Sequence, residues 1–246
     1  MAYAEIKDGV IKVENLSIQY GDTQVMNDIH FECQQGDFVS IVGLSGSGKS
    51  SFLNALAGFI PYTGKIMMPK KFGYIFQNYS VFPWMNVAEN ISFGLENMPD
   101  LEKRKKVDEI LEKIGMKEHA WKYPDQLSGG QVQRVALART FAPDPDVLLA
   151  DEPYGALDHH TRDKMHEWLL NLLIENRKTV IFVTHYIEEA IFLSDKVVVL
   201  RDKKFIANID IPFPRPRRPE VRFDQTFFDL KLHILKEMEG KTIGMG

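Results

Sequence analysis

Residues 43–51 read Gly-Leu-Ser-Gly-Ser-Gly-Lys-Ser-Ser. They fit the pattern G-x-x-x-x-G-K-S, whose fixed positions are Gly43, Gly48, Lys49 and Ser50. The apolar residues 38–42 before this loop suit a buried strand, and residues 52–57 after it suit a helix. In this arrangement, backbone N–H groups and the positive end of a helix dipole face an anion. A glycine-rich turn with a chance lysine is the alternative, but the flanking elements favour a nucleotide phosphate site.

The roles within this loop follow from the residue types. Lys49 can reach the β- and γ-phosphates of a nucleotide, and the Ser50 hydroxyl can ligate Mg²⁺. The loop therefore predicts that the chain binds a nucleoside triphosphate together with Mg²⁺.

Composition limits the class of protein. The 246 residues allow one large domain or a core with a subdomain, and 44% hydrophobic content is enough for a sizeable core. A net charge of −4 gives no indication of a nucleic-acid partner. The single cysteine, Cys33, excludes an internal disulfide, and its alternation with Ile29 and Phe31 predicts packing within a strand. No apolar run approaches the ~18 residues of a membrane helix, so we expect any membrane role to depend on a partner.

Periodicity and turn residues predict an α/β fold. Strands are expected at residues 10–13, 29–33, 63–68, 72–76, 147–150, 179–183, 196–200 and 205–209. Helices are expected from the capping-box pattern at Asn86, over 100–114, from Asp158 onward and over 186–193.

These elements predict a P-loop NTPase core with an N-terminal antiparallel β subdomain and an inserted helical subdomain. As one domain, 1–246, the chain would divide into a core of about 1–79 and 140–210, a helical subdomain of about 80–140 and a C-terminal tail of 211–246. Four prolines between residues 212 and 219 indicate that the tail begins as extended chain.

Three further features lie near strand or helix ends. Leu127-Ser-Gly-Gly-Gln131 precedes an amphipathic helix, where it could face an anion or simply cap the helix. Asp151 and Glu152 follow a buried strand, where open α/β sheets bind ligands, and they could serve Mg²⁺ and water or cap a following helix. His185 also ends a strand, and we interpret it as a γ-phosphate contact although a lone histidine is usually structural. Tyr20, before the turn at Gly21, could stack on an adenine ring or belong to the core.

Taken together, these motifs resemble those of the ATP-binding subunits of ABC transporters, in the order of that family and over about residues 10–223. Residues 43–51 resemble the Walker A loop, and Leu127–Gln131 resembles the signature motif. Val147–Asp151 resembles Walker B, with Glu152 as the catalytic glutamate. The resemblance also identifies Gln77 with the Q-loop, Asp158 with the D-loop and His185 with the switch histidine.

The resemblance implies ATP as cofactor and assigns a role to each motif residue. Glu152, His185 and Gln77 would act in catalysis, and Mg²⁺ would be held by Ser50, Gln77 and Asp151. The implied nucleotide-binding residues are Tyr20, Gly43, Ser45, Gly46, Ser47, Gly48, Lys49, Ser50, Ser51, Ser128, Gly129, Gly130, Gln131 and Asp158.

The resemblance further implies a head-to-tail homodimer in which each ATP lies on residues 43–51 of one copy and 128–131 of the other. A finer similarity, over residues 151–158, 187–195 and 211–217, is to importers of nitrate, sulfonate, taurine and vitamin precursors. Departures from that group are Ser51 in place of threonine, Tyr186 in place of aspartate and a short segment between Thr63 and Phe72.

The resemblance also implies a place at the cytoplasmic face of the cell membrane. There the chain would be peripheral, held by transmembrane permease subunits and served indirectly by a solute-binding protein. The expected docking surface is Tyr79–Met85, where aromatic residues and Met gather around Pro83. Packing of these side chains within the helical subdomain is the alternative. Two other classes stay open: a soluble, non-transport ABC ATPase, and a P-loop kinase or GTPase, which would not need Leu127–Gln131.

Overall fold

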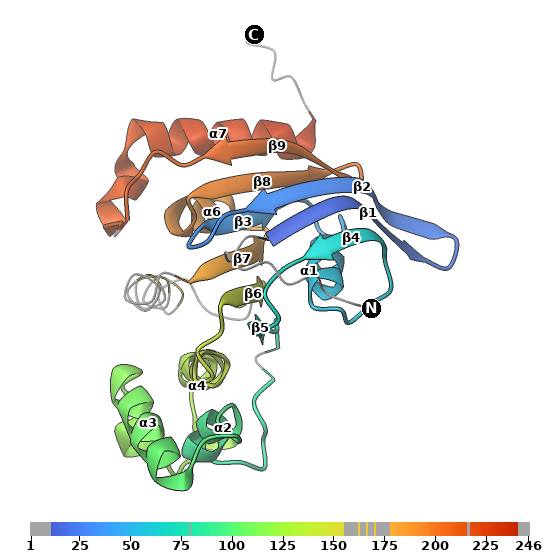
Figure 1. The fold of residues 1–246 in the computed structure, drawn as a ribbon. Helices are drawn as coiled ribbons and strands as arrows, with labels where there is room; N and C mark the ends of the chain where they lie inside the picture. The colour runs from blue at the N-terminus through green and yellow to red at the C-terminus, as the bar shows by residue number, and fades with distance from the viewer. Residues whose placement is uncertain are drawn as a thin grey trace. The chain divides into compact units, whose positions relative to one another are not determined.

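The structure, a computed structural model, describes residues 11–240 except 79, 155–161, 163–165, 167–169, 171–177 and 216. The chain forms two compact units. The first, which we call the sheet unit, comprises residues 1–72, 146–152 and 166–246. The second, the helical unit, comprises residues 73–145 and 153–165. Figure 1 shows the elements of both.

The smaller sheet of the sheet unit is antiparallel, with the strand order β2-β1-β4. Its strands are β1 (Ile11–Tyr20), β2 (Thr23–Cys33) and β4 (Thr63–Met67). Burial alternates along β1 and along the second half of β2, because one face of each strand packs on the core and the other does not. Cys33 is buried at the end of β2, as its alternation with Ile29 and Phe31 predicts.

The larger sheet contributes strands in the order β6-β7-β3-β8-β9 to the sheet unit. They are β3 (Phe38–Val42), β6 (Val147–Asp151), β7 (Thr179–Thr184), β8 (Lys196–Arg201) and β9 (Lys204–Asp210). The first four are parallel and β9 closes the predicted hairpin with β8. Every residue of β3, β6 and β7 is buried, as expected for parallel strands covered on both faces.

Strand register brings three chain segments to one edge of this sheet. Val42 pairs with Thr184, and Asp151 pairs with Val183. The carboxyl ends of β3, β6 and β7 therefore lie side by side. The loop after β3, the acids after β6 and the histidine after β7 meet at this edge, where ligands bind in open α/β sheets.

The sheet unit also contains helices that pack on the larger sheet. They are α1 (Lys49–Leu56), α6 (Ile187–Leu193), η3 (Pro219–Phe223) and α7 (Gln225–Glu239). Helix α1 starts directly from the loop after β3, α6 packs on β3, and α7 packs on α6 and β8 (Figure 1).

The C-terminal segment differs from the prediction of a tail. The described residues of 211–218 have no regular structure, as their prolines predict, but they are followed by the 15-residue helix α7. Asp224 caps this helix and Gly240 ends it in the left-handed conformation. Phe227, Ile234 and Met238 bury one face of the helix, and these widely spaced apolar residues are the sequence signal for it.

The helical unit contains α2 (Val87–Phe93), α3 (Asp100–Lys113), η1 (Lys117–His119), η2 (Pro124–Gln126) and α4 (Gly129–Phe141). Strand β5 (Phe72–Ile75) begins at the boundary of the two units. Helix α2 packs on both α3 and α4. The capping box predicted at Asn86 is confirmed, because Asn86 and Glu89 each accept a hydrogen bond from the other's backbone N–H.

Candidate nucleotide and hydrolysis site

The loop between β3 and α1 requires glycine at two positions for steric reasons. A Cβ on Gly43 would lie 2.5 Å from the Leu200 carbonyl oxygen and 2.8 Å from the Ser47 hydroxyl. Gly48 has φ +106°, and a Cβ there would lie 2.8 Å from Val25 Cγ1. Gly48 is also the N-cap of α1, so its conformation sets the direction in which the first N–H groups of the helix point.

Lys49 is buried beneath this loop. It is 5% exposed, and its ammonium group donates to the carbonyl oxygens of Gly43 at 2.9 Å and Leu44 at 3.0 Å. Burial lowers the pKa of Lys49, while the charges of Glu152 and Asp151 act in the opposite direction. An ammonium group has three donors. Lys49 can therefore remain bonded to the loop and also donate to a phosphate oxygen.

Ser50 and Asp151 form a pair of oxygen ligands. The Ser50 hydroxyl donates to Asp151 Oδ1 at 2.9 Å. Burial raises the pKa of Asp151, and the hydrogen bond from Ser50 partly offsets that rise. A hydroxyl and a carboxylate are ligands that suit Mg²⁺, which keeps several waters and takes its other oxygens from phosphates. The pair predicted from the sequence as metal ligands is thus assembled at the sheet edge.

Glu152 and His185 are also brought together. His185 Nδ1 lies 2.8 Å from Glu152 Oε2, although the residues are 33 positions apart. Glu152 has φ +43°, a conformation uncommon for residues other than glycine, and its N–H donates to the carbonyl of Val183 at 2.9 Å. The irregular backbone turns the Glu152 side chain toward the end of β7 and is the kind of local strain found at functional sites.

The aromatic residue at the end of β1 lies at the surface. Tyr20 is 46% exposed, so the alternative that it belongs to the core is wrong. Its hydroxyl lies 3.5 Å from the Ser51 hydroxyl, beside the first turn of α1. A half-exposed ring next to the phosphate loop can stack on a base.

The other predicted residues of the loop differ in exposure. Ser45 and Gly46 are exposed, and Ser47 is half-buried with its N–H donating to the Leu44 carbonyl at 3.2 Å. The loop therefore presents its tip to solvent while Lys49 anchors it from within.

The remaining predicted residues lie outside the sheet unit or outside the described residues. Gln77 is exposed in the turn after β5, and Ser128–Gln131 begins α4. Ser128 and Gln131 form a capping box, so the helix-cap interpretation of this stretch holds. Their approach to the Lys49 loop stays a prediction. Asp158 lies outside the described residues.

Comparison with known proteins decides the family. Residues 26–155 match the ABC transporter family. The chain belongs to the ABC transporter family. It is 39% identical over 235 residues to the aliphatic sulfonates import ATP-binding protein SsuB 1 of Paracoccus denitrificans, covering 94% of this chain and 95% of that one. It is 40% identical over 237 residues to SsuB of Bacillus cereus, covering 91% and 92%.

Solved structures agree with this assignment. The dimeric structure of the bacterial ABC transporter cassette MJ0796 has a TM-score of 0.73 and 32% identity, covering 83% of this chain and all of that one. A second dimeric structure of that cassette, in a post-hydrolysis state bound to ADP and Pi, has a TM-score of 0.73 and 31% identity. The P-loop NTPase fold predicted from the sequence is confirmed, and the chain is an ABC-type ATPase.

Sequence reasoning missed several buried polar residues of the sheet unit. Glu189 and His166 form a buried pair 2.7 Å apart behind the end of β7, and Arg217 donates to carbonyls at the end of α6. The adjacent acids at 188 and 189 are a weak sign of a buried carboxylate, because only one of two neighbouring residues on a short helix can face the sheet. The partner of His166 lies 23 residues away, and two of the carbonyls that Arg217 binds, those of Ile191 and Phe192, lie 26 and 25 residues away, so the local sequence marks neither contact.

Proposed function

We propose that this chain is the ATP-binding and ATP-hydrolysing subunit that powers an importer of a small polar solute, such as a sulfonate, nitrate, taurine or a vitamin precursor. One observation carries the proposal. At a single sheet edge, the Lys49 loop, the Ser50–Asp151 pair and the Glu152–His185 pair meet, in a chain that matches sulfonate-import ATP-binding proteins over nearly their whole length.

Each side chain at this edge then has a distinct task. Phosphoryl transfer needs mainly placement and charge neutralisation. Lys49 and the loop N–H groups hold the β- and γ-phosphates, and Tyr20 stacks on the adenine. Ser50 and Asp151, with Gln77 as the third expected ligand, would hold Mg²⁺, which would neutralise charge on the phosphates.

Two residues serve the reacting atoms. Glu152 accepts a proton from the attacking water as general base, and its 18% exposed side chain leaves the carboxylate within reach of solvent. His185, which is 41% exposed in its side chain, contacts the γ-phosphate while its Nδ1 stays paired with Glu152.

We further propose that two copies form the working unit. Each ATP would lie between the Lys49 loop of one copy and Ser128–Gln131 of the other, with Asp158 at the same interface. This arrangement gives a role to both glycine-rich sequences of the chain. The N-terminus of the 13-residue helix α4 supplies dipole and N–H groups to the second side of the nucleotide.

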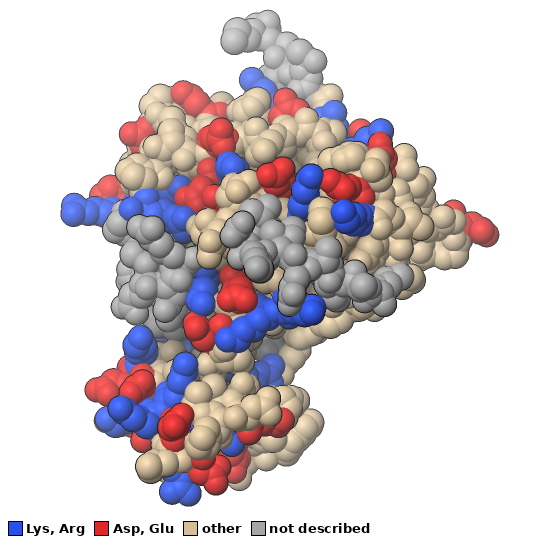
Figure 2. Space-filling view, viewed as in Figure 1, with Lys and Arg blue, Asp and Glu red and all other residues tan. Residues whose placement is uncertain are grey.

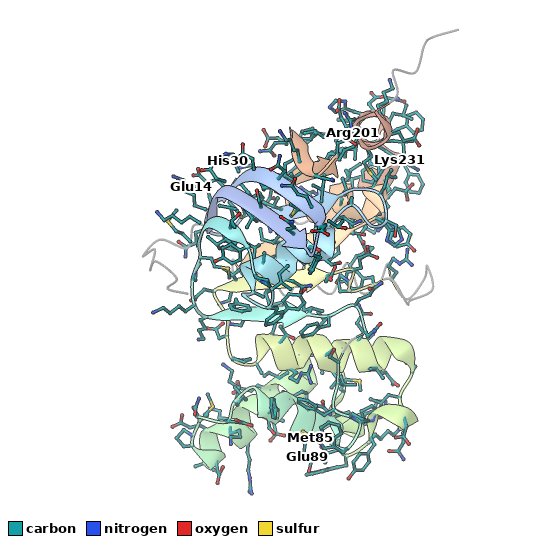
Figure 3. All side chains as sticks on the ribbon, turned by 90° about the vertical axis from the view of Figure 1, so that its right-hand side faces the viewer. Glu14, His30, Met85, Glu89, Arg201 and Lys231 are labelled. Atoms are coloured by element: carbon teal, nitrogen blue, oxygen red, sulfur yellow. The ribbon has the colours of Figure 1, made fainter. Side chains whose placement is uncertain are left out.

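The membrane partner is expected to dock on the helical unit. The described helices include none long and apolar enough to cross a membrane. Trp84 is 68% exposed and, with Met85, Glu89 and Phe93, lines a cavity of about 420 Å³ along α2. Figure 3 labels Met85 and Glu89, both near the start of α2. We propose this rim as the contact for transmembrane permease subunits at the cytoplasmic face, with a solute-binding protein acting through them.

The predicted docking segment is not uniform. Tyr79 lies outside the described residues, and Phe82 is half-buried against Phe93 at 4.7 Å and beneath the Arg139 guanidinium at 4.7 Å. Asn90, fully buried, donates to the carbonyls of Phe82 and Met85 and holds the loop. Phe82 is therefore a packing residue, and Trp84 is the exposed residue available to a partner.

Mixed dimers test the proposed site. Lys49→Ala and Ser128→Arg each damage both sites of a homodimer, so each variant alone should be inactive. A mixed dimer has one undamaged site, and random pairing should restore up to about a quarter of the wild-type hydrolysis. If each ATP were served by one chain only, the mixture would remain as inactive as its components.

A further inference from the structure

The turn that carries His185 is fixed by the side chain just before it. Thr184, the last residue of β7, donates its hydroxyl hydrogen to Glu189 Oε2 on α6. The same hydroxyl oxygen accepts the Tyr186 N–H at 3.0 Å. These two hydrogen bonds bracket His185 and tie its backbone to helix α6.

Glu189 is itself held from its other oxygen. It is 4% exposed, and Oε1 lies 2.7 Å from His166 Nε2. Arg222 Nη2 lies 3.4 Å from His166 Nδ1, and a guanidinium group can only donate. We therefore assign Nδ1 as acceptor and Nε2–H as the donor to Glu189. Each carboxylate oxygen of Glu189 accepts one hydrogen bond, so a partial rotation of the carboxylate would weaken both.

Comparison with the neighbouring acid, Glu188, shows that Glu189 alone is buried toward the end of β7. Glu188 is exposed and pairs with Lys231 on α7, the residue labelled on that helix in Figure 3. Both acids lie in the first turn of α6, where either could interact favourably with the helix dipole. Only Glu189 faces the end of β7. A general helix-dipole role therefore does not account for its contacts.

The orientation of the His185 ring depends on the hydrogen bonds of Thr184. It is exposed, it pairs with Glu152 at 2.8 Å through Nδ1, and its ring centroid lies 3.9 Å from that of Tyr186. Tyr186 is also the residue whose N–H is bound by Thr184. Movement of the turn would shift the imidazole and its stacking partner together.

We infer that Glu189, acting through the Thr184 hydroxyl, is the positioning residue for His185. The inference rests on the proposed function, in which His185 contacts the γ-phosphate. A displacement of about 1 Å in a catalytic group can cost on the order of 100-fold in rate. Loss of the Thr184 hydroxyl should thus impair turnover while the Lys49 loop still binds ATP.

The test compares Thr184→Val, which keeps the shape but removes the hydroxyl, with Thr184→Ser, which keeps the hydroxyl. Ser194→Ala is the matched control, because Ser194, the C-cap residue just after α6, has a buried hydroxyl that donates to the Ala190 carbonyl. We expect Thr184→Val to lower kcat by at least about tenfold with KM for ATP unchanged. Thr184→Ser should recover most of that loss, and Ser194→Ala should leave kcat at the wild-type value.

A double-mutant cycle separates positioning from general destabilisation. In a His185→Ala background, Thr184→Val should lower kcat by no more than about twofold, because its effect passes through the missing imidazole. The ring signal of His185 in NMR spectra should also shift in Thr184→Val and not in Ser194→Ala. An equal loss in both backgrounds, or a wild-type kcat for Thr184→Val, would overturn the inference.

Two controls keep the result interpretable. If Thr184→Val does not fold, Glu189→Gln replaces it in the same cycle, because the amide puts a donor where one of the two acceptor oxygens lies. If the wild-type protein does not hydrolyse ATP, or if its hydrolysis persists in Glu152→Gln, the proposed function fails. If hydrolysis is present and is lost in Glu152→Gln, but the cycle is additive, only the positioning role fails.

Discussion

Replacement of Glu152 by glutamine should separate ATP binding from hydrolysis. The change keeps the size of the side chain and leaves an oxygen or an amide group within reach of His185 Nδ1, at present 2.8 Å from Glu152 Oε2. It removes the group that accepts the proton of the attacking water. General-base catalysis contributes about 10²- to 10⁴-fold, or roughly 3 to 5 kcal/mol of barrier. We therefore expect kcat to fall by at least about 100-fold.

The structure also gives the expected effects on binding and stability. Burial is the main cause of the raised pKa of Asp151, and the charge of nearby Glu152 adds to it, so the two carboxylates repel each other and would repel a triphosphate. Neutralising Glu152 should keep ATP affinity or increase it, and should trap an ATP-bound dimer. A single hydrogen bond is worth about 1 kcal/mol, so the melting temperature should move by only a few degrees.

The assay measures phosphate release, ATP binding and elution volume on size-exclusion chromatography with ATP and Mg²⁺. Glu188→Gln is the matched control, since it makes the same chemical change on the exposed side of α6. Normal hydrolysis by Glu152→Gln would refute the role assigned to Glu152. A loss of hydrolysis together with a loss of ATP affinity would also refute it.

Three further predictions concern docking, the C-terminal segment and pH. Trp84→Ala should leave the melting temperature unchanged but weaken co-fractionation with membrane subunits, whereas Phe82→Ser should lower the melting temperature; unaffected assembly in Trp84→Ala would place the docking surface elsewhere. Arg217→Met should destabilise by about 3 kcal/mol in denaturant unfolding, because it orphans three carbonyls at about 1 kcal/mol each, and equal loss in the exposed neighbour Arg218→Met would contradict this. The pKa of Asp151 is raised, so its ionised form penalises folding at neutral pH by about 1.4 kcal/mol for each unit of increase; Asp151→Asn should melt higher than wild type at pH 7 without Mg²⁺, and this advantage should vanish near pH 4.

The parts of the site that are contiguous in sequence were predictable. The Lys49 loop, the acids after β6 and the histidine after β7 follow short apolar strands, and parallel strands place their carboxyl ends together. The capping boxes at Asn86 and Ser128 are likewise local patterns of four residues. Local rules determine these features, so periodicity and spacing find them.

Features that depend on distant partners were not predictable. Arg215 pairs with Asp195 at 2.7 Å and donates to the Gly36 carbonyl, so a stretch that reads as a free proline-rich tail is bound to the core. Burial of Arg217 lowers its pKa to about 10. Nothing in its sequence neighbourhood distinguishes it from exposed Arg218.

The sequence also did not predict which aromatic side chains are exposed. Phe82 and Trp84 are both aromatic and two residues apart, and only the packing of Phe93 and Arg139 separates a core role from an exposed one. Figure 2 shows acidic and basic side chains interspersed over the face in view. Such mixing depends on which residues the fold brings to the surface.

The most direct test of the central claim is steady-state phosphate release by the purified chain, measured with ATP and Mg²⁺ over a range of protein concentrations. The account predicts Mg²⁺-dependent hydrolysis that rises more steeply than in proportion to protein concentration, because the complete site needs two copies, and that is lost in Lys49→Ala. Hydrolysis strictly proportional to concentration under monomeric conditions, or unaffected by Lys49→Ala, would contradict it.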